Sequence, residues 1–289
     1  GYINIIGHPN VGKSTLLNAL LGEHLMITSP KAQTTRHRIL GIWNDDGHQL
    51  VFSDTPGVIL PAYALQEQMM EFVRSSFEDT DVFLYLTAPE DQPLQDKVMR
   101  EKLRKTGRPV LLVLNKIDLL DPLRLESARQ FWQVEMPQAE FWPLSAKEGF
   151  GVEELRKRLL ELVPESPPYF PKENLSDRNE RFFCEEMIRE QVLLNYDQEV
   201  PYACEVAVEE FKEHPDILRI RAIIYVERDS QKAIVVGKGG QMIKKTGTAA
   251  RKRLEAFFDQ KVFLDLQVKV RKNWRQNEGD LRRFGYRRS

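Results

Sequence analysis

The sequence predicts an α/β protein in two domains, in which a mostly parallel, doubly wound sheet is followed by a smaller α+β domain. Short apolar strands alternate with helical segments in the first half, a proline-rich stretch follows, and a different order of helices and strands comes after it. The length of 289 residues also exceeds what one hydrophobic core usually organises. Two separate cores are therefore expected.

Five short apolar segments in the first half have the length and composition of strands, at residues 2–6, 49–53, 82–87, 110–114 and 141–144. Longer periodic segments between most of them favour helices on both faces of a parallel sheet. Ligands bind such sheets at the carboxyl ends of the strands. The residues that follow each strand are therefore the first candidates for a site.

A proline-rich segment separates the two halves. Four prolines between residues 164 and 171 remove backbone donors and fix φ, so neither a long helix nor a central strand can continue there. We expect a first domain at residues 1–163, a linker at 164–177 and a second domain at 178–289.

The second half has the order helix, strand, strand, helix, helix, strand. We expect a helix over 178–195, strands over 202–211 and 217–228, and two helices on either side of a glycine-rich turn at 237–240. A last strand is indicated by an alternating set of apolar residues, Val262, Leu264, Leu266, Val268 and Val270.

Charge is distributed unevenly, although the whole chain carries only −1. Residues 1–174 hold 19 basic and 24 acidic side chains, residues 175–229 hold 7 and 14, and residues 230–289 hold 16 and 5, which gives −5, −7 and +11. Clustered cations favour a polyanion such as a nucleic acid, because phosphates release counterions on binding. A solvated, highly charged end of the chain is the alternative.

Membrane-spanning and secreted proteins are not indicated. The longest apolar runs fall well short of the roughly 20 residues that a transmembrane helix needs. No charged leader precedes the first strand, and Cys184 and Cys204 lack metal-type spacing. We expect reduced thiols in a cytoplasmic protein.

The first candidate site follows the strand at 2–6. The residues GHPNVGKS match G-x-x-x-x-G-K-[ST] and precede a helix-forming run. Backbone N–H groups of such a loop surround the phosphates of a nucleotide, Lys13 would reach the β- and γ-phosphates, and the Ser14 hydroxyl would bind Mg²⁺. The nucleotide-binding residues expected here are Asn10, Val11, Gly12, Lys13, Ser14 and Thr15.

The choice of base is indicated by the motif N-K-x-D, which follows the strand at 110–114. The Asp118 carboxylate can accept hydrogen bonds from N1–H and the exocyclic amine of guanine, whereas adenine presents a lone pair at N1. A wrong base would leave a buried acceptor unpaired, at a cost of about 1–3 kcal/mol. Asn115 would tether the loop and the base, and the stem of Lys116 would lie along the ring. Guanine O6 would be contacted by the segment after the strand at 141–144, which comprises Ser145, Ala146 and Lys147.

The metal and the γ-phosphate are indicated by D-T-P-G, which ends the strand at 49–53. Asp54 can hold Mg²⁺ through water, and the amide of Gly57 can meet the γ-phosphate. Between this motif and the P-loop lie Thr34 and Thr35, one of which would bind Mg²⁺ only while the γ-phosphate is present; we favour Thr35. The expected catalytic residues are then Lys13, Thr35 and Gly57, and the expected Mg²⁺ ligands are Ser14, Thr35 and Asp54.

The exact residues of these motifs resemble those of one protein family. HPNVGKST, AQTTRHR, DTPG, NKID and LSA, followed by a proline-rich linker and a GKGG-bearing domain, resemble the Era family of bacterial ribosome-assembly GTPases over nearly the whole chain. The resemblance implies a P-loop GTPase domain and a type II KH domain, with GTP, GDP and Mg²⁺ as ligands. It also implies binding of the 3′ region of 16S ribosomal RNA and of the 30S subunit, and a peripheral association with the inner membrane.

One position departs from the pattern of many GTPases. Val58 occupies the place where they have a glutamine that orients the attacking water. Because Asn10 matches an asparagine that related GTPases use to coordinate a monovalent cation, we hypothesise that K⁺ supplements Mg²⁺ there. The alternative is that Asn10 only braces the loop.

The candidate RNA site is the G-x-x-G turn of the second domain. Glycines at 237 and 240 allow a nucleotide backbone to approach closely, which indicates single-stranded nucleic acid, and the family resemblance implies that this nucleic acid is RNA. Cations mixed with aromatic residues follow the last strand and continue to Arg287, where they would pair with phosphates and stack on bases. The expected RNA-binding residues are Gly237, Lys238, Gly239, Gly240, Lys244, Lys245, Arg251, Arg271, Lys272 and Trp274. A structural helix–turn–helix and a solvated tail are the alternatives.

Two other functions compete with a nucleotide-gated RNA-binding GTPase. A P-loop kinase would pass phosphate to a small acceptor, but N-K-x-D and the missing arginine cluster of a lid count against it. A constitutive RNA-binding module with a merely structural GTP site would bind RNA equally in all nucleotide states.

Overall fold

The computed structural model describes residues 1–286 and consists of two compact units. The first unit comprises Gly1–Ala62 and Gln66–Asp177, and the second comprises Tyr63–Leu65 and the chain from Arg178 onward. No helix among the described residues is long and apolar enough to cross a membrane.

The first unit contains a six-stranded sheet in the order β2-β3-β1-β4-β5-β6. Neighbouring strands from β3 to β6 pair in parallel, whereas β2 runs antiparallel to β3. The strands are β1 (Tyr2–Gly7), β2 (Ile39–Asn44), β3 (Gln49–Asp54), β4 (Val82–Thr87), β5 (Val110–Leu114) and β6 (Glu140–Pro143). The predicted mostly parallel sheet is confirmed.

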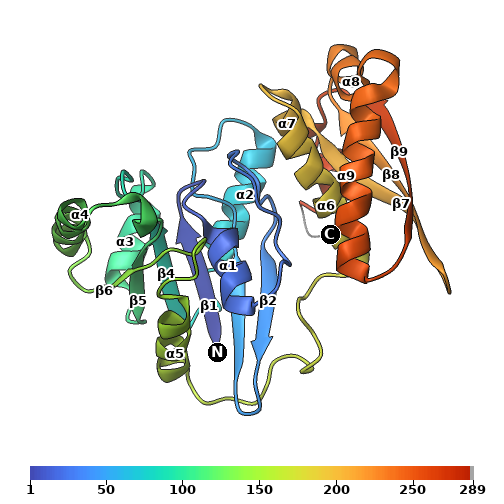
Figure 1. Ribbon diagram of the computed structural model, residues 1–289. Coiled ribbons are helices and arrows are strands. Elements are labelled where there is room, and N and C mark those ends of the chain that lie inside the picture. Colours follow the sequence, from blue (N-terminus) through green and yellow to red (C-terminus); the bar gives the residue numbers. More distant parts are fainter. Residues whose placement is uncertain (287–289) are drawn as a thin grey trace. The chain divides into compact units, whose positions relative to one another are not determined.

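Helices cover both faces of this sheet, so its central strands are buried on both sides. All six residues of β4 are buried, as are all five of β5, which explains why these strands are continuous apolar runs in the sequence. In Figure 1, α1 and α5 lie in front of the sheet, and α2 and α3 lie behind it. The helices are α1 (Lys13–Leu21), α2 (Ala64–Ser75), α3 (Lys97–Lys105), α4 (Pro122–Glu135) and α5 (Val152–Leu162), with a 3₁₀ turn η1 (Ile117–Leu119).

The edge strand β2 was not expected from the sequence. Its residues ILGIWN directly follow a polar segment and carry no regular alternation. The register with β3, from Ile39 opposite Asp54 to Asn44 opposite Gln49, makes this segment a strand. Pairing between strands therefore decides its conformation, which local periodicity does not reveal.

The second unit contains a three-stranded sheet in the order β7-β8-β9. β8 pairs antiparallel with β7 and parallel with β9. The predicted order of elements is present, with a short helix α7 added before β7. The elements are α6 (Glu180–Asn195), α7 (Val200–Ala203), β7 (Glu205–His214), β8 (Ile217–Val226), α8 (Asp229–Val236), η2 (Lys238–Gly240), α9 (Gln241–Phe258), β9 (Val262–Val270), η3 (Trp274–Gln276) and α10 (Glu278–Arg283).

One face of β8 is the core of this unit. Alternating residues of the strand are at most 1% exposed, namely Leu218, Ile220, Ala222, Ile224 and Val226. α6 packs against α9 and β7, and α9 packs against β9. The turn between α8 and α9 therefore projects from a rigid support.

Candidate functional site

The loops that follow β1, β3, β5 and β6 meet at one edge of the first sheet. Parallel strands bring their carboxyl ends to the same edge, and four of the motifs found in the sequence begin there. One cavity is lined by P-loop residues 9–10 and 12–15, by residues 27–29 and 33–35, and by Gly57. Most of the predicted phosphate-binding groups therefore share one site.

Three predicted metal ligands converge beside this cavity. The Ser14 hydroxyl donates to Asp54 Oδ2 at 2.8 Å and lies 2.9 Å from Thr35 Oγ1, which itself donates to Asp54 Oδ2 at 3.2 Å. Asp54 is fully buried, and Thr35 is 9% exposed. Two hydroxyl oxygens and a carboxylate are the kind of donor set that Mg²⁺ takes from a protein that leaves its other positions to phosphate and water.

Thr35, and not Thr34, contacts the other two predicted metal ligands. The hydroxyl of Thr34 points back into its own loop, donating to the carbonyl of Lys31 at 2.7 Å and lying 2.7 Å from Ser29 Oγ. The hydroxyl of Thr35 instead reaches Ser14 and Asp54. The two adjacent threonines thus have different contacts, and of the two only Thr35 lies with Ser14 and Asp54 in the cluster of predicted metal ligands.

Lys13 is the buried cation of the P-loop. Its Nζ donates to the carbonyl of His8 at 2.9 Å and lies 3.5 Å from the carbonyl of Gly7. Burial lowers the pKa of Lys13 to about 8, an effect that the negative charges of Asp54 and Asp91 partly oppose. A phosphate that binds here would stabilise the ammonium form.

Gly57 lies in direct contact with the P-loop. A Cβ at this position would be 2.6 Å from the backbone nitrogen of Pro9, so no side chain fits. The amide of Val58 donates to the carbonyl of Gly7 at 2.9 Å, and the Val58 side chain is 3% exposed. The D-T-P-G motif is therefore fastened to the phosphate loop, and the residue after its glycine offers no polar side chain.

The base-reading loop is fastened to the P-loop as well. Asn115 Nδ2 donates to the carbonyl of Val11 at 2.8 Å, and Asn115 Oδ1 accepts from the amide of Ala146 at 2.9 Å. Lys116 Nζ donates to the carbonyl of Asn10 at 2.7 Å. Asn115 thus links three of the predicted segments.

Close packing explains the glycine at position 12. Gly12 has φ 98°, and a Cβ there would lie 2.3 Å from Asn115 Nδ2. A side chain would be strained by the left-handed backbone and would also displace Asn115. The second glycine of the P-loop motif is therefore required by the base-reading loop.

Asp118 is exposed and oriented by a neighbouring loop. The Ser145 hydroxyl donates to Asp118 Oδ1 at 2.6 Å and accepts from the amide of Glu148 at 3.3 Å. Lys147 is exposed and pairs with Glu148 at 3.2 Å. A carboxylate held in this way remains available to a base at the mouth of the site.

The sequence analysis missed the residues 27–29, which line the phosphate cavity. They follow α1 in a loop with no motif. The side chain of Asn18 holds this loop, because it both donates to and accepts from the backbone of Met26 at 2.8 Å. Asn18 was the one available signal in the sequence: a buried amide in a helix needs hydrogen-bond partners, and the loop that follows the helix supplies them.

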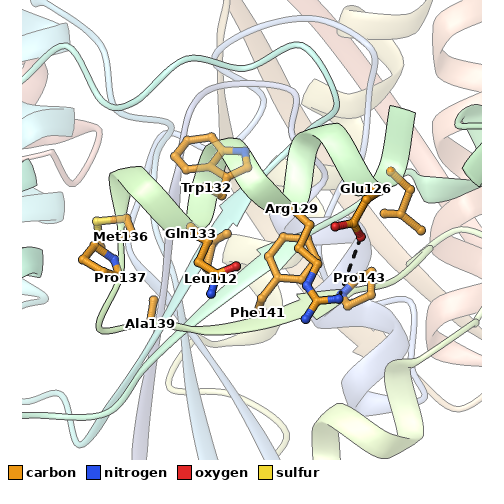
Figure 2. A pocket seen from close by; sticks show the side chains of 11 residues that line it. Leu112, Glu126, Arg129, Trp132, Gln133, Met136, Pro137, Ala139, Phe141 and Pro143 are labelled. Atoms are coloured by element: carbon orange, nitrogen blue, oxygen red, sulfur yellow. Dashed lines mark ion pairs between the residues drawn. The ribbon is translucent and has the colours of Figure 1, made fainter. Parts of the chain in front are cut away.

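A larger cavity of about 530 Å³ lies elsewhere in the first unit, beneath α4 at the β6 edge (Figure 2). Its lining is mostly apolar, with Leu112, Trp132 and Phe141 among its residues. The two charged side chains at this cavity, Glu126 and Arg129, lie 3.8 Å apart and pair with each other. Nothing in this lining matches the motifs that predict phosphate binding.

The second candidate site is the glycine-rich turn between α8 and α9. Gly237, Gly239 and Gly240 have φ values of 73°, 59° and 79°, so the turn itself requires glycine. Lys238 is exposed at its tip, and Lys244 and Lys245 are exposed on α9. The G-x-x-G turn therefore presents backbone and ammonium groups on one end of α9.

Trp274 corrects one expectation. This residue is fully buried, its indole N–H donates to the carbonyl of Ala203 at 2.8 Å, and its ring packs edge-on against Phe284. Tyr286 is also buried, and its hydroxyl donates to Glu205. The aromatic residues after β9 fill the core of the second unit, so the prediction that Trp274 stacks on RNA bases is wrong.

The predicted cations divide into two groups. Arg251 pairs with Glu255 at 3.1 Å, and Arg271 pairs with Asp280. Lys238, Lys244, Lys245 and Lys272 are exposed and have no ion pair among residues 1–286. Arg287, which the predicted basic tail includes, lies outside the described residues.

Comparisons with known proteins agree on both units. The family model described as "50S ribosome-binding GTPase" matches residues 2–116, and the KH-domain model matches residues 199–275. GTPase Era from Geotalea uraniireducens is 46% identical over 288 residues, which cover 99% of this chain and 97% of the relative.

Two solved structures match nearly the whole chain. The crystal structure of Era in complex with MgGDPNP and nucleotides 1506–1542 of 16S ribosomal RNA has a TM-score of 0.94 and 37% identity, and covers 99% of this chain and 98% of that one. A variant of Aquifex aeolicus Era bound to GDP and AlF₄⁻ has a TM-score of 0.95 and 36% identity with the same coverage.

The fold and the site together define a P-loop GTPase domain joined to a KH domain. The loops that carry the phosphate, metal and base motifs are held together by Asn115, Lys116 and Ser14, as the geometry shows. The chain belongs to the Era family of GTPases, and the kinase interpretation is set aside.

Proposed function

We propose that this chain is a nucleotide-gated RNA-binding GTPase of small-subunit assembly. It binds GTP in the first unit, binds the 3′ region of 16S ribosomal RNA through the KH domain, and changes its affinity for RNA or for the 30S subunit with the nucleotide state. The observation that carries this proposal is the contact of Ser14, Thr35 and Asp54, because it joins the phosphate loop to a segment that the γ-phosphate can order.

The roles of the nucleotide-site residues follow from the geometry. Ser14, Thr35 and Asp54 would hold Mg²⁺, which would supply positive charge beside the phosphates. Lys13 offsets the charge that develops on the β- and γ-phosphates, and the Gly57 amide donates to the γ-phosphate. Asp118, held by Ser145, selects guanine.

K⁺ is the second cation in this proposal. Val58 cannot orient the water, and Asn10 has an exposed side chain in a left-handed backbone conformation with φ 64° at the phosphate cavity. The Asn10 carbonyl is already used by Lys116, which leaves the side-chain oxygen for a cation. Equal hydrolysis rates in Na⁺ and K⁺ buffers of the same ionic strength would exclude this role.

The proposed RNA surface is narrower than the sequence predicts. It consists of the G-x-x-G turn at 237–240 with the exposed lysines Lys244, Lys245 and Lys272. Arg251 and Arg271 take part only by exchanging their carboxylate partners for phosphates. Trp274 supports the fold beneath this surface.

The ribosomal subunit is inferred from the RNA in the related complex. The family model that names the 50S subunit matches only residues 2–116, within the GTPase unit, and does not reach the KH domain. The Era structure that resembles the whole chain contains RNA from the small subunit. We therefore propose the 30S subunit as the partner, in the cytoplasm or at the periphery of the inner membrane, and domain limits of 1–163, 164–177 and 178–289.

The test is to measure the affinity for a single-stranded RNA with the sequence of the 16S 3′ end in GDPNP, in GDP and without nucleotide. Gating predicts different affinities, with a change of about 5–150-fold, as is usual for coupled sites. Equal affinities in all three states would support the constitutive RNA-binding module instead.

A further inference from the structure

Residues 169–177, which we call the strap, are attached to the GTPase unit over their whole length. At one end, Gln49 Oε1 accepts from the amides of Tyr169 and Phe170 at 2.7 and 3.0 Å. In the middle, the carbonyl of Lys172 accepts from Asn44 Nδ2 at 3.0 Å. In Figure 1 this segment follows α5 and passes the β2–β3 end of the sheet.

The other end of the strap pairs with the edge strand β2. The amide of Ile42 donates to the carbonyl of Leu175 at 2.9 Å, and Ser176 Oγ donates to the carbonyl of Leu40 at 2.6 Å. The amide of Leu40 donates to Asp177 Oδ1 at 2.9 Å, and Ser176 forms an antiparallel bridge with Gly41. The strap thus satisfies the outward-facing backbone groups of an otherwise open sheet edge.

These hydrogen bonds connect the chain just after the predicted metal ligand Thr35 with the chain just before helix α6 of the second unit. Leu40 is five residues after Thr35, the metal ligand that the γ-phosphate orders. Asp177 is two residues before Asn179, whose side chain caps α6, the first helix of the KH-containing unit. A short path therefore leads along the chain from Thr35 to Leu40, across the hydrogen bond from Leu40 to Asp177, and along the chain again into α6.

We propose that the strap is the element that reports the nucleotide state to the KH domain, an inference that rests on the gating proposed above. When Thr35 is held by Mg²⁺, the start of β2 is held as well, and the strap stays docked. When Thr35 is released after hydrolysis, Leu40 becomes mobile and its bonds with Ser176 and Asp177 open. The strap is held by one bridge and by eight hydrogen bonds to residues 40–49 among the described residues, all at the edge of the sheet, so it can detach without unfolding the sheet.

Detachment changes the length of the tether. A docked strap leaves only one residue, Arg178, between Asp177 and the cap Asn179 of α6. A freed segment from Val163 to Asp177 contains four prolines and therefore behaves as a semi-rigid spacer, which reaches up to roughly 40 Å over 14 steps. The local concentration of the KH domain near the GTPase domain falls accordingly.

Hydrogen exchange on the full chain tests this proposal directly. The amides of Leu40 and Ile42 donate to the strap, so they should exchange at least about tenfold more slowly with Mg²⁺ and GDPNP than with Mg²⁺ and GDP. The double variant Ser176→Ala/Asp177→Ala removes the two side-chain bonds to Leu40. It should abolish this difference and bring the ratio of RNA affinities in the two states close to one.

Gln49→Ala is the matched control, because it removes the strap contacts farthest from Thr35. It should keep both the exchange difference and the affinity ratio, and it should not change GTP affinity by more than about twofold. Equal exchange rates of the Leu40 and Ile42 amides in GDPNP and GDP would overturn the proposed role of the strap. The same role would be overturned if the double variant kept the full ratio of RNA affinities in the two states. If the protein bound the RNA in no nucleotide state but still showed the exchange difference, the proposed function would be overturned. The nucleotide-dependent docking of the strap would then still hold.

Discussion

At the scale of single residues, the nucleotide site depends on side chains that hold other loops in place. Asn115 contacts the P-loop and the loop of Ala146, and Ser145 orients Asp118. The motifs are thus mutually supporting. A substitution in one loop is expected to disturb its neighbours as well as its own contact with the ligand.

The substitution Asp118→Asn tests whether Asp118 determines the selectivity for guanine nucleotides. An amide in place of the carboxylate can donate to the 2-carbonyl of xanthine, whereas it meets the 2-amine of guanine with its own N–H. We expect GTP affinity to fall by at least about tenfold and affinity for xanthosine triphosphate to rise above it, measured by competition binding. Unchanged preference for GTP would contradict the assignment of Asp118.

The lowered pKa of Lys13 predicts a pH dependence of GTP binding. Phosphate binds the ammonium form, so affinity is complete well below pH 8 and is lost as the pH rises through the pKa of about 8. Between pH 7.0 and 8.5 the Kd for GTP should increase about fourfold, measured by calorimetry. Lys13→Arg stays charged in this range, so its weaker affinity should remain flat, and a flat wild-type profile would refute the prediction.

At the scale of elements, the segment after β9 shows how composition misleads. Its cations and aromatic residues have the pattern of a nucleic-acid-binding tail, yet α10 and Trp274 pack against the KH core. Lys272, Arg282 and Arg283 are exposed, whereas Trp274, Leu281 and Tyr286 are buried. The amphipathic character of the segment serves the fold first.

Trp274→Phe separates a structural role from RNA binding. Loss of the indole N–H leaves the buried carbonyl of Ala203 without its donor, so we expect a loss of about 1–2 kcal/mol in the free energy of unfolding. Urea unfolding measures this loss. The RNA affinity of the folded variant should stay within about twofold of the wild-type value. A large loss of RNA affinity without a loss of stability would instead indicate that Trp274 contacts the RNA.

At the scale of the whole molecule, charge separation matters more than net charge. The chain carries −1 in total, but residues 230–289 carry +11 and residues 175–229 carry −7. A screening length of about 8–10 Å in physiological salt lets the basic segment act locally. The chain can therefore bind a polyanion although its net charge is slightly negative.

Salt titration of RNA binding tests this separation. If three or four exposed lysines contact phosphates, the slope of log K against log salt should be about −2 to −3 for single-stranded RNA. Lys244→Ala/Lys245→Ala should reduce the size of this slope by about 1.4 and weaken binding for all sequences alike. A slope near zero, or an unchanged slope in the double variant, would place the RNA elsewhere.

The sequence by itself determined the mostly parallel sheet, the order of elements in the KH domain, and the phosphate, metal and base motifs, because each depends on local spacing next to an apolar strand. Only the tertiary structure decided that Thr35 rather than Thr34 meets Asp54, that Trp274 is a core residue, and that 39–44 is a strand. These outcomes depend on which partner a segment meets across space, as Leu40 meets Ser176 and Asp177, and no local pattern records that partner. Pairing energy, which exists only once the chain is folded, supplies the information that periodicity lacks.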